Sequence, residues 1–386
     1  MPADPAAGAE WVAGQAEAHP ALAERYAKFS DLCTRKLWHQ LTDEVADFVN
    51  DPACQSSTNL VDLYSSFVKT FETRISQLAL VRIAVAVSKT HADKAAAMSF
   101  LEELAKEEER IGKEAHLLCV CEIARLHVAT GRLADAQITL ASRRSQVEGL
   151  VGAAPVVYSS FYGAAAAYHK VSGPPQDFYS NALMMLAYSP VDEMEQAERH
   201  ELARDLALAA LAGREIFNFG EVIATPILSA LEGTAEAWLG ELLHTLHRGD
   251  IDRFNEIVAA NEAAFAAQPA LSAEREFIKE KAALLCLTEL LFQRPSHERT
   301  VPFEDIARAT RMDVSQVEWM MMRAMSLKLL KGTIDQVEQQ VSVTWVVPRV
   351  LDNTQIALLR ERLQGWGDKV EGTLHLIQDE THELFQ

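Results

Sequence analysis

The sequence predicts a mainly α-helical protein: a solenoid of tetratricopeptide-like helical hairpins, then a small winged-helix domain, then a C-terminal helix. Three observations predict this fold class. Amphipathic helical patterns follow one another from about residue 21 to about residue 298, without a convincing run of strand-like alternation. Residues 300–351 show the order helix, turn, helix and two-stranded wing. Beyond Pro348, apolar residues recur at helical spacing towards the end of the chain.

These patterns divide the chain into four parts. Residues 1–25 are rich in Ala, Pro and Gly, and they lack the basic start and apolar core of a signal peptide, so we expect a flexible tail. Residues 26–270 form the predicted solenoid. Residues 271–350 contain the winged helix, and residues 351–386 form a C-terminal helix that we expect to join a helical bundle.

Composition excludes several classes of function. The formal net charge of -19 and the isoelectric point near 5.1 disfavour binding to nucleic acid or to an anionic membrane. No stretch approaches the ~18 uninterrupted apolar residues that would cross a bilayer. The five cysteines are odd in number and widely scattered, which is typical of reduced thiols in a cytoplasmic or nuclear protein.

Two passages indicate the hairpin repeat of the solenoid. Residues 124–127 are followed by a second helical pattern at 131–136, and residues 243–247 are followed by one at 249–254. In both, an apolar helix stops at a turn that begins with glycine. Residues 162–188 predict another pair of helices around the break at Gly173-Pro174-Pro175. Since one hairpin cannot bury both of its faces, stacked pairs are the expected arrangement.

The winged-helix segment has its own signals. Ser315 and Glu318 have the spacing of a capping box, which predicts a helix start. Val341, Val343 and Trp345 alternate with more polar residues, which predicts a half-buried strand in the wing. We expect these three residues to mark a partner-binding edge, because the outer strand of a wing can pair with a strand of another protein.

A winged helix can also bind DNA, but the charges here argue against that. Between Arg294 and Arg349 the sequence has eight Lys or Arg against seven Asp or Glu, so the segment is nearly neutral. Binding to duplex DNA depends on a clustered basic face. We therefore expect the winged helix to bind protein and not nucleic acid.

The C-terminal helix carries one apolar seam. Its residues recur at steps of three and four, which places them on one face of a helix. Three glycines in the same stretch weaken an isolated helix by about 1 kcal/mol each relative to alanine. We therefore predict that this helix packs against partner helices through Leu359, Leu363, Trp366, Val370, Leu374 and Ile377.

No constellation of residues predicts catalysis, a cofactor or a metal ion. His244 and His247 are three residues apart on a predicted helix, but nothing nearby completes a ligand set of three or four. The sequence contains neither a phosphate-binding glycine loop with its lysine nor a dinucleotide fingerprint. We expect a protein that is not an enzyme and needs no cofactor.

Several segments together resemble a known family. The chain from about Asp31 to its end is similar to the PCI-domain proteins of the 26S proteasome regulatory particle lid, in particular to the family of its non-ATPase subunit thirteen. Short segments carry this resemblance: Lys36–Thr42, Asp47–Pro52, Ile216–Glu221, Phe303–Ala307, Val317–Glu318, Lys331–Asp335 and Thr344–Asp352. The first of them points to this family, whereas the winged-helix segments mark only the wider PCI class.

The resemblance implies a non-catalytic scaffold of the lid, which serves ubiquitin-dependent protein degradation. It implies that the winged helix pairs with those of other PCI subunits, that the terminal helix joins the helices of the deubiquitinase pair, and that the solenoid extends near a ubiquitin receptor. Two alternatives remain open: a tetratricopeptide-like adaptor that binds peptide tails, and a PCI subunit of the signalosome or a translation initiation factor. A third, an RNA-binding PCI subunit of an export complex, is disfavoured by the near-neutral charge of the winged helix. A basic groove would favour the adaptor, but the solenoid is acidic overall.

Overall fold

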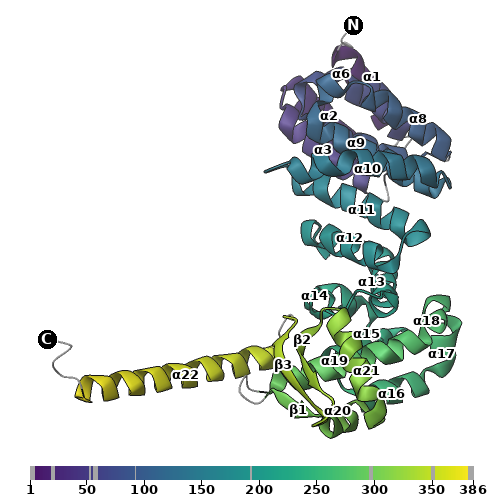
Figure 1. The fold of residues 1–386 in the computed structure, drawn as a ribbon. Helices are drawn as coiled ribbons and strands as arrows, with labels where there is room; N and C mark the ends of the chain where they lie inside the picture. The colour runs from purple at the N-terminus through teal and green to yellow at the C-terminus, as the bar shows by residue number, and fades with distance from the viewer. Residues whose placement is uncertain are drawn as a thin grey trace. The chain divides into compact units, whose positions relative to one another are not determined.

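The helical pattern of the sequence reappears in the computed structural model, which describes residues 5–18, 22–51, 54, 60–91, 93–191, 194–294, 299–348 and 353–380. The chain forms two compact units, Met1–Glu193 and Met194–Gln386 (Figure 1). The regular elements in the described part of the first unit are all helices, and the second unit adds a small sheet to its helices. The mainly α-helical prediction is therefore confirmed.

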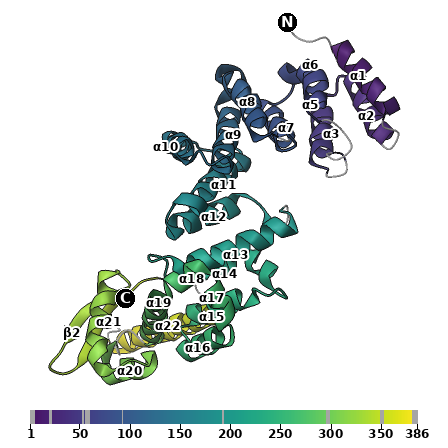
Figure 2. The same ribbon diagram turned by 90° about the vertical axis from the view of Figure 1, so that its right-hand side faces the viewer.

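The helices of the first unit are short and consecutive (Figure 2). In chain order they are α1 Pro5–Ala18, α2 Ala23–Thr34, α3 Trp38–Asn50, α5 Leu60–Leu63, the π-helical turn η2 Tyr64–Val68, α6 Lys69–Phe71, the 3-10 turn η3 Glu72–Arg74, α7 Gln77–Lys89, α8 Lys94–Ala105, α9 Glu108–Ala129, α10 Leu133–Gly149, α11 Pro155–Ser172 and α12 Pro175–Tyr188.

Aromatic rings form much of the core in the N-terminal part of this unit. Phe29 lies edge-on to Phe48, with 5.4 Å between ring centroids, and stacks on Phe67 at 6.0 Å. All three side chains are fully buried. Such pairs add about 0.5–1.5 kcal/mol beyond the area that they bury. These contacts fix helices α2 and α3 and turn η2 against one another.

Helix α1 corrects the prediction of a flexible tail in residues 1–25. It packs against α2 and η2, and Val12 on its inner face is fully buried. At Gly8, helix α1 comes so close to α6 that an added Cβ would lie 2.9 Å from the Thr70 hydroxyl oxygen. The abundance of alanine and glycine, which suggested a disordered tail, here permits close packing of helices.

The two glycine turns that the sequence singled out have the same geometry. Gly131 between α9 and α10, and Gly249 between α15 and α16, both adopt left-handed backbone angles. In each turn the next residue donates to a carbonyl five positions back: Arg132 to His127 at 2.9 Å and Asp250 to Thr245 at 3.2 Å. This is the hydrogen bond that ends many helices at a glycine. The predicted helix pairs are confirmed, and so is the pair α11 and α12 around residues 173–175.

The second unit contains the winged helix. In chain order its elements are α13 Gln196–Ala212, α14 Gly220–Ala224, the 3-10 turn η5 Pro226–Leu231, α15 Ala237–Arg248, α16 Ile251–Ala260, α17 Glu262–Ala267, α18 Pro269–Ala273, α19 Arg275–Gln293, β1 Thr300–Pro302, α20 Phe303–Thr310, α21 Val314–Ser326, β2 Leu330–Asp335, β3 Gln340–Val346 and α22 Asn353–Glu380.

Helix α19 belongs to the core of the winged helix as well as to the helices before it. Its residues Leu284, Leu287 and Leu291 lie in one buried cluster with Ile306 of α20 and Met321 of α21. The same helix also contacts α15, α16 and α18. Because α19 is apolar on more than one face, the chain does not divide at residue 270, where the sequence suggested a boundary. It divides between residues 193 and 194.

The sheet has the strand order β1-β3-β2, and both pairings are antiparallel. Strand β3 is therefore central. The register of β2 and β3 shifts between Lys331 and Gly332. At Gly332 the strands approach so closely that an added Cβ would overlap the Ser342 carbonyl oxygen, which explains glycine at this irregular position.

The predicted capping box is not formed. Helix α21 begins at Val314 with Asp313 as its N-cap, so Ser315 lies inside the first turn and makes no side-chain cap. The Glu318 carboxylate instead accepts a 3.0 Å hydrogen bond from the Gln336 amide in the wing. Spacing alone placed the helix start two residues too late. None of the described helices is long and apolar enough to span a bilayer.

Candidate partner-binding surfaces

The structure places the three predicted wing residues differently from one another. The side chains of Val341 and Val343 are buried in the core of the second unit, at 0% and 5% exposure. Trp345 is exposed, and the Lys331 ammonium lies 5.2 Å from its ring centroid. Because β3 is central, its ladder is already paired on both sides along residues 340–342. The prediction that Val341 and Val343 contact a partner is therefore corrected, and only Trp345 is accessible.

The wing nevertheless has an open edge, which belongs to β2. The Val343 N–H donates to the Arg299 carbonyl at 2.9 Å, so the backbone groups of Val343, and by alternation those of Val341, point towards β1. Ile334 stands opposite Val341. Its N–H and carbonyl therefore point away from β3, towards the side on which β2 has no neighbouring strand in the described sheet. This edge can pair with a strand of another protein.

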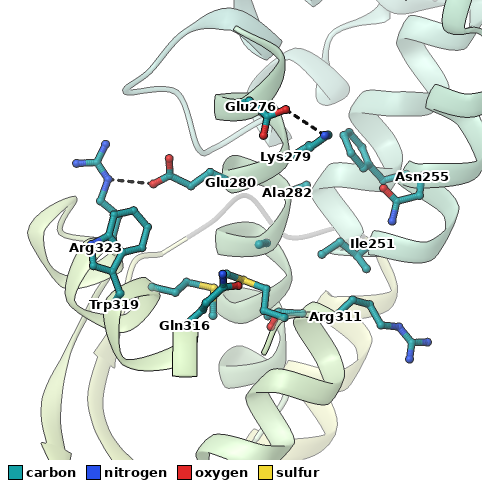
Figure 3. Close-up of a pocket in the computed structure, with 15 residues that line it drawn as sticks. Ile251, Asn255, Glu276, Lys279, Glu280, Ala282, Arg311, Gln316, Trp319 and Arg323 are labelled. Atoms are coloured by element: carbon teal, nitrogen blue, oxygen red, sulfur yellow. Dashed lines mark hydrogen bonds and ion pairs between the residues drawn. The ribbon is translucent and has the colours of Figure 1, made fainter. Parts of the chain in front are cut away.

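A groove lies beside the winged helix, between α16, α19 and the helices α20 and α21 (Figure 3). Its volume is about 450 Å³. Trp319 of α21 lines it, with more than half of the side chain exposed, while Ile251 and Asn255 of α16 line it on the opposite side of α19. The exposed face of α21 also carries Met322. This face is apolar where a DNA-binding helix would be basic.

The arginines next to this groove are bound to carboxylates. Arg311 donates to both oxygens of Asp252, at 3.1 and 2.8 Å, and Arg323 donates to Glu280 at 3.0 Å. Hydrogen bonding from Arg311 lowers the pKa of the Asp252 carboxyl group. Cations that are already paired offer little to a phosphate backbone. The geometry agrees with the near-neutral charge count of this segment.

The apolar seam of α22 lies on the surface. Its six predicted residues are each between 44% and 67% exposed, and Ile356 and Leu376 are exposed in the same helix. Arg362 of α22 donates a 2.7 Å hydrogen bond to the Gln293 carbonyl at the end of α19. A row of exposed leucine, valine and tryptophan side chains is unusual on a helix in water. It is the kind of surface that helical bundles bury.

One buried polar residue was missed from the sequence. Lys281 of α19 is 0% exposed, and its side-chain nitrogen donates to the carbonyl oxygens of Ala210 and Gly213, each at 2.7 Å. The rings of Phe217 and Phe219 surround it, with centroids 5.6 and 5.1 Å from the nitrogen. The segment that contains these two phenylalanines was noted only for its family resemblance. No local pattern pointed to a lysine sixty-four residues later in the chain.

Reactive chemistry has little support among the described residues. Burial raises the pKa of both Cys119 and Cys121 to about 12, so these thiols stay protonated and are poor nucleophiles. No group of three or more His, Cys, Asp or Glu side chains in the described ranges is arranged to hold a metal ion. The open edge of β2, the groove beside α21 and the seam of α22 are surfaces that a partner can contact.

Comparison with known proteins identifies the family. The model of PSD13 N-terminal repeats matches residues 25–243, and the PCI domain model matches residues 248–345. The chain is 38% identical to the 26S proteasome non-ATPase regulatory subunit 13 homolog B of Arabidopsis thaliana, over 98% of this chain and 99% of the relative. It is 33% identical to 26S proteasome non-ATPase regulatory subunit 13 of Dictyostelium discoideum, over 95% of both chains.

A more distant likeness marks the wider class. The chain is 27% identical to eukaryotic translation initiation factor 3 subunit M of Aspergillus clavatus, but over only 56% of this chain and 45% of that protein. By contrast, it is 32% identical to the 26S proteasome regulatory subunit RPN9 of Saccharomyces cerevisiae over 92% of both chains. With this coverage and both family models in their expected order, the chain belongs to the family of 26S proteasome non-ATPase regulatory subunit 13.

Proposed function

We propose that this protein is a non-catalytic structural subunit of the lid of the 26S proteasome regulatory particle, where it scaffolds assembly for ubiquitin-dependent protein degradation. The observation that carries this proposal is similarity along nearly the whole chain to relatives named as regulatory subunits of the 26S proteasome. Both the solenoid and the winged helix fall within that similarity.

The geometry supports assembly through two surfaces. The open edge of β2 can pair with a strand from the winged helix of another PCI subunit, because its outward backbone groups keep their hydrogen-bonding capacity. The exposed seam of α22 can enter a helical bundle with the helices of the deubiquitinase pair. Burying one leucine-sized side chain contributes ~1.5–3 kcal/mol, so six such residues provide a strong association surface even after ordering costs.

The proposal includes the absence of catalysis. Relatives are named as regulatory subunits, and the two buried cysteines of α9 are protonated thiols. We further propose a solenoid that extends near a ubiquitin receptor and a location in the cytoplasm and nucleus. An odd number of scattered cysteines suits those reducing compartments.

Two other readings are less well supported. A PCI subunit of an initiation factor complex would require the partial likeness to subunit M to outweigh matches that cover more than nine-tenths of both chains. An adaptor for peptide tails leaves the exposed apolar seam of α22 unexplained. The scaffold accounts for both the seam and the open edge.

The test is purification under native conditions from cells that express a tagged copy of this chain. We expect it to sediment with the 26S proteasome and to co-purify with other PCI subunits. The matched control is the same chain truncated after Asp352, which keeps the winged helix and lacks α22. Recovery of the full-length chain only as a monomer, or only with an initiation factor complex, would contradict the proposal.

A further inference from the structure

A second groove, entirely within the first unit, combines an apolar floor with a basic rim; we call it the basic groove. Helices α3, α7, α9 and α11 line it, and its volume is about 230 Å³. Its floor is made of small and aliphatic side chains: Ala46, Val49, Ile83, Val85, Ala86, Leu118 and Val156. Its polar lining consists of Asn50, Arg82, Lys89, Glu122, Arg125 and Ser160.

The rim carries more positive than negative charge. Arg82 and Lys89 on α7 are both exposed, and within the described part of the chain neither makes an ion pair. Arg125 on α9 lies 3.3 Å from the carboxylate of Glu122, the one acidic side chain among the lining residues. Three cations against one carboxylate stand out in a chain whose formal net charge is -19. This concentration of charge favours an anionic ligand.

The spacing of the cations indicates what kind of anion fits. Arg82 and Lys89 are seven residues apart on α7, which places them on one face of the helix and separates their backbones by roughly 10 Å. Arg125 adds a third cation from the neighbouring helix α9. One terminal carboxylate could not reach all three. Several carboxylates along a peptide could, and the apolar floor between them has room for one aliphatic side chain.

Nucleic acid fits this groove poorly. Proteins that bind single strands usually offer aromatic rings on which bases stack. The described lining contains no Phe, Tyr, Trp or His. Its floor of alanine, valine, isoleucine and leucine suits an aliphatic side chain instead.

We propose that the basic groove binds an acidic peptide segment of a partner protein, in which side-chain carboxylates flank one aliphatic residue. This goes beyond the proposed scaffold function, which rests on the winged helix and on α22 in the second unit. The peptide contacts are charge-assisted at the rim and apolar at the floor. Affinity should therefore fall as salt concentration rises, since the rim cations are exposed and screened by ions.

The test uses the full-length protein and a short fluorescent peptide in which glutamates surround a central leucine, with its C-terminus amidated. We expect saturable binding by fluorescence anisotropy at low salt. A peptide with glutamines in place of the glutamates should bind at least about tenfold more weakly, and so should one with serine in place of leucine. A labelled single-stranded oligonucleotide should not compete with the acidic peptide.

Three variants locate the binding site. Arg82→Gln with Lys89→Gln removes the two cations of α7 and should weaken binding by about tenfold or more. Glu122→Gln removes the only lining carboxylate and releases Arg125 from its ion pair, so it should tighten binding by about threefold. Lys36→Gln with Arg132→Gln changes the net charge as much as the α7 variant does. Both of those residues are exposed and outside the groove, so this control should bind as tightly as the original chain.

A gain in affinity is informative because misfolding does not produce one. The proposal is overturned if the glutamine peptide binds as well as the acidic one, or if the α7 variant and its charge-matched control weaken binding equally. It is also overturned if only peptides with an unblocked C-terminus bind, or if the oligonucleotide displaces the peptide. Retained binding by the α7 variant with an intact helical circular dichroism spectrum would likewise contradict it.

Discussion

Lys281 donates a 2.7 Å hydrogen bond to the carbonyl oxygen of Gly213, sixty-eight residues earlier in the chain. The contact joins the middle of α19 to the residue that follows α13, where the last carbonyl groups of a helix lack partners within the helix. A second hydrogen bond of 2.7 Å reaches Ala210. The fully buried side-chain nitrogen of Lys281 therefore holds the C-terminal end of α13 against the helix that also forms part of the winged-helix core.

This lysine should make stability depend on pH. Burial lowers its pKa to about 7, whereas the unfolded chain keeps the ordinary value of 10.5. Between these values the unfolded state binds more protons, so the stabilising contribution is complete above pH 10.5 and is lost as the pH falls through 7. We expect the free energy of unfolding, measured by urea titration relative to Lys281→Met, to rise between pH 7 and 10. A single titrating group can change the free energy of unfolding by at most about 1.4 kcal/mol per pH unit.

The control is Lys279→Met on the same helix, where the lysine is exposed and paired with Glu276. The difference in free energy of unfolding between Lys279→Met and the original chain should not show this rise with pH. A flat difference for Lys281→Met as well would mean that the buried amine keeps one protonation state throughout.

Arg311 should tolerate glycine better than alanine. It ends α20 with a left-handed φ of 56°, a conformation that glycine adopts without cost and alanine does not. Both substitutions remove the ion pair with Asp252, so their difference isolates the backbone term. We expect Arg311→Gly to be more stable than Arg311→Ala by about 1 kcal/mol in thermal or urea unfolding.

The opposite order should hold at Arg308, which lies inside the same helix and is exposed. There Arg308→Ala should be more stable than Arg308→Gly by about 1 kcal/mol, because glycine is a poor helix former. If alanine were also the better residue at position 311, the turn would not keep its left-handed conformation in solution.

The edge of β2 can be tested at Ile334. Proline there removes an N–H that points away from β3, so it should prevent pairing with a partner strand while the ladder between β2 and β3 is retained. Ile334→Ala is the matched control, because it also truncates the half-buried side chain but keeps the N–H. We expect Ile334→Pro to reduce incorporation into the lid at least fivefold below Ile334→Ala on native gels, if strand addition contributes about 1 kcal/mol.

Ser342 would be a poor site for such a proline. Its backbone groups point towards β2, opposite Thr333, so proline would break the sheet itself. Equal incorporation of Ile334→Pro and Ile334→Ala would show that the edge of β2 is not a docking strand.

The seam of α22 can be tested without shortening the chain. Leu363→Asp with Val370→Asp places two charges on a surface that we expect to be buried in the lid, and an unpaired buried charge is costly. The isolated protein should keep its melting temperature, because both side chains are already exposed. Incorporation into the lid should fall below detection on native gels.

The control is Arg360→Asp with Lys369→Asp, which adds the same number of carboxylates at exposed positions outside the predicted seam and changes the net charge of the helix even more. We expect this control to assemble. A seam variant that assembles normally, or one that lowers the melting temperature of the isolated chain by many degrees, would show that the seam serves the monomer.

Local patterns in the sequence determined much of this fold. A glycine after an apolar run placed the turns at Gly131 and Gly249, because only a residue without a Cβ enters left-handed backbone angles without strain. Spacing by three and four residues placed the seam of α22 on one face. The exposure of the seam is what we expect of a helix that packs against other proteins. The alternation of Val341 and Val343 correctly predicted a strand with one buried side.

Strand order, however, came from the tertiary structure. Alternation reports which side of a strand is buried but not which strands lie beside it, so the sequence could not reveal that β3 is central. The helix formed by Pro5–Ala18 was hidden in the same way, since its stabilising contacts lie on α2 and η2 and its own composition resembles a flexible tail.

The basic groove and the buried position of Lys281 also depended on residues far apart in the chain. Overall composition gave an acidic chain, whereas the fold brings Arg82, Lys89 and Arg125 to one groove from separate helices. In the sequence, Lys281 does not differ from other lysines on helices. It is buried and donates to backbone carbonyls only because α19 packs against the end of α13. The sequence determined most of the helices, their turns and the family, because those depend on near neighbours in the chain. The tertiary structure decided which side chains face water and which charges meet, because those depend on segments tens of residues apart.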